Sequence, residues 1–297
     1  MIPLLVNGLL EGTRFGLAGL GFAIIFYTTK ELHFAYGAMI AASGYLAYVL
    51  FAILEMPAVV TVIAVLLVSA LAGILLQRYL YRYLPDPLAV LLFSFGLTIV
   101  LENLLHLQFG PDDRVMPRTA LSASVHIEAL GVFARVIDVV AVGGFIAVWV
   151  FMYLLMEKHR TGMALRAVMQ DPEMSELVGI RTQRIKVFAY GIGSAIGAIA
   201  GLIAVTRTGV RPSAGFDIML FAFIVTLLGV GRIHRVAAWG LGLGTFMGLV
   251  AWQLPTQFRT VLAFAGMLIY LVVREYRVKG TGRRVKMDDA QAAEVES

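Results

Sequence analysis

The sequence predicts an all-α polytopic membrane protein, and three observations support this fold class. Sixty per cent of the 297 residues are hydrophobic, 14% are charged, and the mean hydropathy is +0.85. A soluble domain carries about a quarter charged residues. The apolar residues form blocks long enough to cross a bilayer, which takes about 20 residues as a helix. Irregular backbone cannot face lipid, so each block is expected to be helical.

We predict about nine transmembrane helices, within a range of eight to ten, in one domain over residues 1–273. In chain order, the expected spans are Leu9–Tyr27, Ala35–Leu54, Ala58–Leu76, Leu88–Phe109, Val132–Met156, Val187–Thr206, Gly215–Val230, Val236–Gln253 and Phe258–Val273. The first has neither a basic leader nor a clear cleavage site, which favours a retained span over a signal peptide. Glycine-rich or short spans are candidates for broken or re-entrant helices.

The distribution of lysine and arginine predicts the orientation of the chain. Residues 157–186 form a polar segment between spans, and cytoplasmic loops retain basic residues. With this segment inside, 17 basic residues lie inside against 6 outside. The N-terminus is therefore expected outside and the C-terminus in the cytoplasm. Residues 274–297 carry both charge signs without an apolar period, which predicts a disordered cytoplasmic tail near the lipid surface.

Glycines recur four residues apart in three of the spans. This spacing lets membrane helices approach closely, because the contact has no side chains to hold the backbones apart. Tight packing within the chain is the expected role, and a sliding or dimer surface is the alternative. The predicted packing glycines are Gly8, Gly12, Gly16, Gly193, Gly197, Gly201, Gly240, Gly244 and Gly248.

The polar segment contains a short predicted helix, Pro172 to Val178. Asp171 is a typical N-cap, Pro172 fits the first turn, and Glu173 places a negative charge at the positive end of the helix dipole. Gly179 is the expected stop. Two helical turns are too short to be stable alone in water. The helix must therefore lie on its own bundle or insert into a partner, and both remain open; its apolar residues are Met174, Leu177 and Val178.

Ionisable residues inside a span are costly and mark candidate sites. Glu102, Asn103 and His106 lie on the fourth span, where Glu102 and His106 share a helical face and are candidates to hydrogen-bond each other. Either they tie helices together or they line a pathway. Glu11 and Arg14, near the outer end of the first span, are candidates to pair across helices or to meet an external partner.

Several classes of chemistry have no support in the sequence. The chain has no cysteine, its five histidines lack metal-ligand spacing, and no serine, histidine and acid set suggests a nucleophile. The G-x-x-x-x-G-K-[ST] phosphate loop is absent, so any ATP must be used by a partner. We therefore expect no enzymatic activity, no catalytic residue and no bound metal or cofactor. The net charge of +5 is modest and does not require a nucleic-acid partner to explain it. Arg135 and Asp138 are interpreted as interfacial.

The polar segment resembles the cytoplasmic loop of the branched-chain amino acid type of ABC transporter permease. The matching positions are Gly162, Arg166, Ala167, Asp171, Pro172, Glu173, Gly179 and Ile180. Three further segments agree in order: Gly8 to Tyr27 followed by HFAYG, GLTIVLENLLHLQFGPDDRVMP, and Pro212 with LLGVGR. The likeness runs from Gly8 to Val273.

The resemblance implies a permease subunit of an ATP-driven importer in the bacterial cytoplasmic (inner) membrane. It implies two ABC ATPase subunits that use ATP and Mg, a second permease subunit, homologous or identical, and an external solute-binding protein. The short helix would couple to the ATPase through Arg166, Asp171, Pro172, Glu173, Met174, Leu177 and Gly179. The candidate pathway residues are His33, Phe34 and Tyr36 of HFAYG, with Glu102, Asn103 and His106.

Departures from the family pattern leave the substrate open. HFAYG replaces the usual NFAHG, and Glu102 stands where glutamine is common. Branched-chain or related amino acids are the favoured class, with urea, amides, aromatic compounds or simple sugars as alternatives. A self-sufficient ion-coupled transporter or channel is the competing function, in which Glu102, His106 and Asp138 would relay protons or bind ions.

Overall fold

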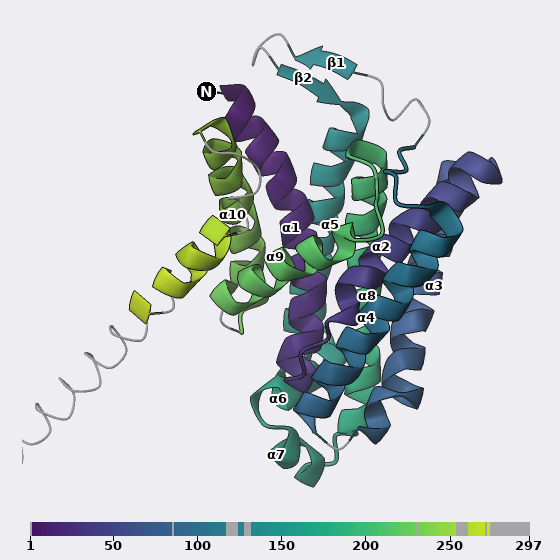
Figure 1. Ribbon diagram of the computed structural model, residues 1–297. Helices are drawn as coiled ribbons and strands as arrows, with labels where there is room; N and C mark the ends of the chain where they lie inside the picture. Colours follow the sequence, from purple (N-terminus) through teal and green to yellow (C-terminus); the bar gives the residue numbers. More distant parts are fainter. Residues whose placement is uncertain are drawn as a thin grey trace, which may run out of the picture.

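The computed structural model describes residues 2–84, 86–116, 124–127, 132–229, 231–253, 261–270 and 272–273. Within these ranges the chain is an all-α bundle with one short β-hairpin (Figure 1). The tail predicted at residues 274–297 lies outside the described residues. The elements are α1 (Ile2–Thr29), α2 (Ala35–Tyr48), a π-helical turn (Val49–Ile53), α3 (Ala58–Tyr79), a 3-10 turn (Tyr81–Tyr83), α4 (Pro87–Phe109), β1 (Ser124–Ile127), β2 (Val132–Arg135), α5 (Val136–Lys158), α6 (Arg160–Gln170), α7 (Pro172–Leu177), α8 (Thr182–Arg207), α9 (Ala214–Gly229) and α10 (Ile233–Gln253).

Seven helical segments in the described part of the chain are long and apolar enough to cross a membrane. They correspond to seven of the predicted spans, and the protein is a multi-pass membrane protein. The seventh and ninth predicted spans are shorter apolar helices, Ala214–Gly229 and Val261–Tyr270. The described residues thus hold seven long apolar helices and two shorter ones at the places of the predicted spans, and the count of about nine transmembrane helices stays a prediction.

Two predicted boundaries were wrong. The fifth span begins at Val136 rather than Val132, because residues 132–135 pair as β2 with the antiparallel strand β1. The first helix begins at Ile2, seven residues before the predicted start at Leu9. The polar residues Asn7 and Glu11 therefore lie on α1 itself.

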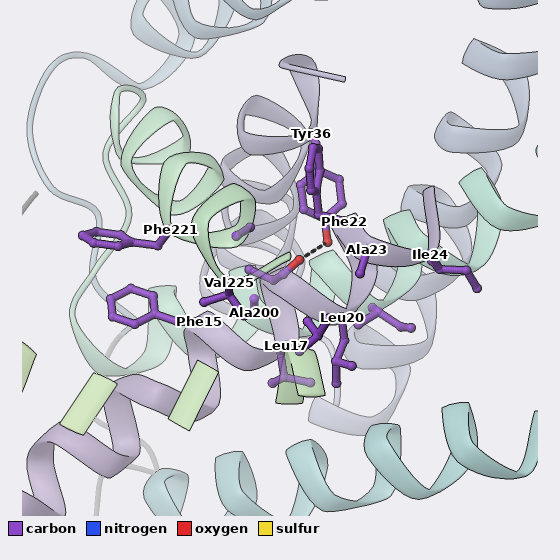
Figure 2. Close-up of a cluster of buried hydrophobic side chains, with 14 of the residues drawn as sticks. Phe15, Leu17, Leu20, Phe22, Ala23, Ile24, Tyr36, Ala200, Phe221 and Val225 are labelled. Carbon is purple, nitrogen blue, oxygen red and sulfur yellow. Dashed lines mark hydrogen bonds between the residues drawn. The ribbon is translucent and has the colours of Figure 1, made fainter. Parts of the chain in front are cut away.

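The bundle is built around α1, which packs against α8, α9 and α10. Residues 17–25 of α1 are almost fully buried. Figure 2 shows this core, in which the rings of Phe15 and Phe221 have centroids 4.5 Å apart. The Tyr36 hydroxyl donates to the Ala18 carbonyl at 3.0 Å, which ties α2 to α1. By contrast, α3, α4 and α5 expose apolar side chains along most of their length, as helices that face lipid or another subunit do.

The predicted packing glycines lie at close helix contacts. A Cβ added at Gly12 would come within 2.8 Å of the Leu241 Cα, and one at Gly8 within 2.9 Å of the Gly244 carbonyl oxygen. On α8, a Cβ at Gly193 would come within 2.5 Å of the Gly21 carbonyl oxygen. Glycine therefore lets α10 and α8 approach α1 at backbone distance.

The two ends of the bundle differ. The N-terminal end of α1 and the β-hairpin lie at one end, which we call the hairpin end, and α6 and α7 lie at the opposite end, the α7 end (Figure 1). The antiparallel contacts of α1 with α10 keep residues 8–16 of α1 beside residues 240–248 at the hairpin end. Polar features thus gather at both ends of the apolar bundle.

Candidate functional site

The α7 helix has the predicted cap and stop. The Asp171 side chain accepts a hydrogen bond from the Met174 N–H at 3.0 Å, and Pro172 is the first helical residue. Gly179 follows the helix with φ +86, a backbone conformation that suits glycine. The helix ends at Leu177, one residue before the predicted end. These local interactions hold a two-turn helix at the tip of the polar segment.

The apolar residues of α7 point away from the bundle. Met174 is 61% exposed, Leu177 81% and Val178 75%. The opposite side is covered, because Ser175 is buried. Its hydroxyl donates to the carbonyl of the N-cap Asp171 at 2.7 Å, within the same helix. A side-chain hydrogen bond from Thr182 to Glu176 joins α7 to the start of α8. The predicted alternative in which this helix lies with its apolar residues on its own bundle therefore does not apply to these three residues.

Helix α6, which the sequence did not predict, attaches this tip to the bundle. Its residues Leu165 and Val168 are fully buried, and Gly162 lies against the main chain of Leu155 on α5. Arg166 sits on α6 rather than α7 and forms an ion pair with Glu157 at 3.1 Å. Helix α6 thus lies between α7 and α5 and contacts both. The three-residue spacing of Gly162, Leu165 and Val168 between polar residues, which places them on one helix face, was the signal for α6.

The HFAYG residues lie in the core near the α7 end. His33 is fully buried, and its Nδ1 lies 2.8 Å from the Tyr81 hydroxyl. Burial lowers the pKa of His33 to about 3, so its imidazole is neutral at physiological pH. The Phe34 N–H donates to Ser94 at 3.0 Å, which joins this link to α4. This placement favours a packing role for His33 and Tyr36 within a single chain.

A neighbouring acid in the same link is paired. Glu31 lies 3.8 Å from Lys186 at the start of α8. Burial raises the pKa of Glu31, and the positive charge of Lys186 partly opposes this rise. The link between α1 and α2 is thereby tied to α8 by charge as well as by packing.

The polar residues of α4 do not form the predicted pair. No hydrogen bond between Glu102 and His106 occurs among the described residues, and one Glu102 carboxylate oxygen is buried without a partner. The Asn103 amide donates to the Ile99 carbonyl of its own helix at 2.8 Å. His106 is exposed on the same helix. These side chains therefore tie no helices together in the isolated chain.

A charged network that the sequence did not assemble lies at the hairpin end. Arg207 of α8 is 3.1 Å from Glu11 of α1 and 2.8 Å from Asp138 of α5. Arg14 is 2.6 Å from Glu11 and donates to Thr208 at 3.2 Å. Of the predicted alternatives for Glu11 and Arg14, contact across helices is the one observed, with Glu11 paired to Arg207 and Arg14 hydrogen-bonded to Thr208. Asp138, predicted to be interfacial, is buried beside Arg207 at the hairpin end.

The network borders a cavity of about 660 Å³ between α1, α2, α8, α9 and α10. Arg211, Asp113 and Asp217 bring further charges to its lining, and Phe15, Ile218, Phe221 and Met247 bring apolar surface. This volume lies within the range of about 300–1,000 Å³ for small-molecule sites. Sequence reasoning missed Arg207, Arg211, Asp113 and Asp217; isolated charges beside the ends of apolar spans were the only signal.

With this geometry described, comparison with known proteins decides the family. A family profile described as "Branched-chain amino acid transport system / permease component" matches residues 4–273. The chain belongs to this permease family. The permease is 26% identical over 291 residues to the high-affinity branched-chain amino acid transport system permease protein BraD of Pseudomonas aeruginosa, covering 93% of this chain and 94% of that protein.

Two further relatives and one solved structure agree. The permease is 26% identical over 293 residues to LivH of Escherichia coli (strain K12), covering 92% of this chain and 94% of that protein. It is 22% identical over 267 residues to a probable LivH of Methanocaldococcus jannaschii, covering 86% and 83%. The structure of PsaBC from Streptococcus pneumoniae in complex with Fab shares the fold, with a TM-score of 0.52 and 11% identity over 90% of this chain and 89% of that chain.

Proposed function

We propose that this permease is the membrane-spanning subunit of an ATP-driven importer and that α7 is its coupling helix. The observation that carries the proposal is the tip formed by Met174, Leu177 and Val178, which is capped, attached on one side and exposed on the other. Exposed apolar residues on a small ordered element are typical of a docking surface. An ATPase subunit with a matching cleft would cover them, because the chain has no phosphate loop of its own.

The proposal assigns the orientation. The α7 end faces the cytoplasm, where ATP is available, and the hairpin end faces the outside, where a solute-binding protein delivers the substrate. The excess of basic residues on the α7 side supports this assignment. The cell membrane is then the bacterial inner membrane, and the C-terminal segment is cytoplasmic.

Two copies of the ATPase and a second permease subunit complete the proposed assembly. The second permease would pack on exposed surface of this chain, and the exposed α4 carries Glu102, Asn103 and His106. Charged residues avoid lipid because the hydrocarbon core does not solvate them. We therefore place the pathway beside α4, with these three residues in contact with water or the solute.

The proposed substrates are branched-chain or related amino acids. The family description and the names of the BraD and LivH relatives support this class. ATP and Mg would be bound by the partner ATPase, and the permease itself would need no cofactor.

Co-purification and transport test the proposal. The permease is purified in mild detergent with its candidate ATPase, reconstituted into proteoliposomes with the second permease and the binding protein, and assayed for uptake of labelled leucine. We expect a stable complex and uptake that requires ATP. Uptake driven by an ion gradient without ATP, or no complex with the ATPase, would refute it and favour the ion-coupled transporter.

A charge reversal on α7 separates coupling from folding. Glu173→Lys should leave the amount of folded permease unchanged and uncouple ATP hydrolysis from uptake, because the reversed charge opposes the helix dipole and the docking surface. Asp112→Lys, an equally exposed reversal at the hairpin end, is the matched control for ATPase docking. Equal uptake by both variants and the wild type would contradict the coupling role.

A further inference from the structure

The cavity at the hairpin end carries charges that the protein leaves unpaired. Among the described residues, Asp113, Asp217 and Arg211 form no ion pair, although all three line the cavity. The Glu11, Asp138, Arg14 and Arg207 network is internally neutral, so Asp113, Asp217 and Arg211 form a separate set that lines the cavity.

Backbone pairing places opposite charges next to each other at the rim. Arg114 and Val210 exchange two backbone hydrogen bonds of 2.9 Å in an antiparallel bridge. In such a bridge the residue before one partner lies beside the residue after the other, so Asp113 and Arg211 are neighbours. Neighbouring opposite charges that form no pair with each other are free to bind a ligand that carries both.

Part of the cavity wall is apolar, and Asn7, Thr208 and the paired residues Glu11, Arg14 and Arg207 line other parts. Phe15 of α1, Ile218 and Phe221 of α9, and Met247 of α10 line the apolar part. A neutral polar solute or an inorganic ion would leave this surface without a complementary group. An amino acid with an aliphatic side chain has a carboxylate, an ammonium group and an apolar side chain, which match the three kinds of lining.

We propose that this cavity is an external acceptor site for an amino acid zwitterion with an apolar side chain. The carboxylate binds Arg211, the ammonium group binds Asp113 and Asp217, and the side chain lies on the apolar part of the wall. The proposal rests on the proposed function and deepens it, because it assigns the residues that receive the substrate after its release outside. The α4 residues Glu102, Asn103 and His106 do not line this cavity.

Matched variants test the charges. In proteoliposomes that hold the complete transporter and the loaded binding protein, Asp113→Asn and Arg211→Gln should each lower leucine uptake about tenfold, the effect of losing one hydrogen bond to a charged group. ATPase activity stimulated by the loaded binding protein should stay unchanged. Asp112→Asn, next in sequence and outside the cavity lining, should transport like the wild type.

The absence of cysteine permits a second measurement that does not depend on those variants. Ala214 lines the cavity and its neighbour Ser213 does not, so Ala214→Cys and Ser213→Cys each provide a single thiol in an otherwise cysteine-free chain. External leucine should slow the reaction of Ala214→Cys with a membrane-impermeant thiol reagent and leave Ser213→Cys unaffected. The amine that lacks the carboxylate and the 2-oxo acid that lacks the ammonium group should protect neither.

The outcomes separate the two proposals. A wild-type transporter that moves no amino acid with ATP refutes the proposed function. If the wild type transports an amino acid with ATP but Asp113→Asn transports as well as Asp112→Asn, the acceptor site is refuted and the proposed function is not. The acceptor site is also overturned if leucine protects both thiols equally or protects neither. Protection of Ala214→Cys by the singly charged analogues equal to that by leucine would overturn it as well. Loss of the permease pair in Arg211→Gln, seen as a smaller complex by size, would show that the charges serve subunit assembly instead.

Discussion

Truncating Leu177 to alanine should weaken binding of the ATPase without affecting the permease fold. The side chain is 81% exposed in the isolated permease, so removing it costs the bundle little. Full burial of a leucine side chain contributes about 1.5–3 kcal/mol, and alanine retains part of this. We therefore expect a loss of about 1–2 kcal/mol, which is about 5- to 30-fold in the dissociation constant.

The assay is titration of purified ATPase onto the permease in nanodiscs, with the thermal midpoint of the permease measured in parallel. Leu107→Ala is the matched control, since Leu107 is 85% exposed on α4 and lies outside the polar segment. We expect an unchanged midpoint for both variants and weaker binding only for Leu177→Ala. Equal affinity of Leu177→Ala and the wild type would refute the docking of α7, and a lowered midpoint would show that Leu177 packs on the bundle.

The remaining predictions concern packing, capping and charge. Gly12→Ala should destabilise the bundle by about 1–3 kcal/mol because its Cβ meets the main chain of α10, whereas Gly143→Ala, with nothing within 4 Å, should leave the thermal midpoint unchanged. Asp171→Ala should cost about 1 kcal/mol of helix capping and lower coupled uptake, and Asp171→Asn should restore it; equal uptake by both would contradict the role of the cap. Arg207→Met should destabilise the permease by about 3–5 kcal/mol by leaving the buried Asp138 without its ion-pair partner, while Glu11 keeps Arg14, and an unchanged midpoint would show that water solvates Asp138. Glu102→Ala should lower uptake more than expression, and an equal loss of both would favour a structural role.

The capped helix α7 was predictable because its determinants are local. Asp171, Pro172 and Gly179 act within one or two turns of the chain, and the structure has the cap and stop that they predict. The exposure of Leu177 was left open, since sequence does not say which side of a short helix the bundle covers. Helix α6 determines that side by burying Leu165 and Val168.

The features at the hairpin end were less accessible to sequence reasoning. The β1–β2 hairpin depends on pairing between two four-residue segments, each too short and irregular to stand out beside long apolar spans. The expected Glu102–His106 hydrogen bond followed from helical spacing, which brings side chains to one face without fixing their rotamers. The ion pair of Asp138 with Arg207 was not predicted, because Arg207 lies 69 positions away in the sequence.

The sequence by itself determined that the protein lies in a membrane, where its apolar helices lie along the chain, and that a capped helix stands between the fifth and sixth spans. These follow from composition and from interactions within a few residues. Only the tertiary structure decided which charges meet, which face of α7 is free and where a cavity remains. The physical reason is that α1, α5 and α8 bring Glu11, Asp138 and Arg207 together across the bundle, and close glycine contacts between helices set the space that is left beside them.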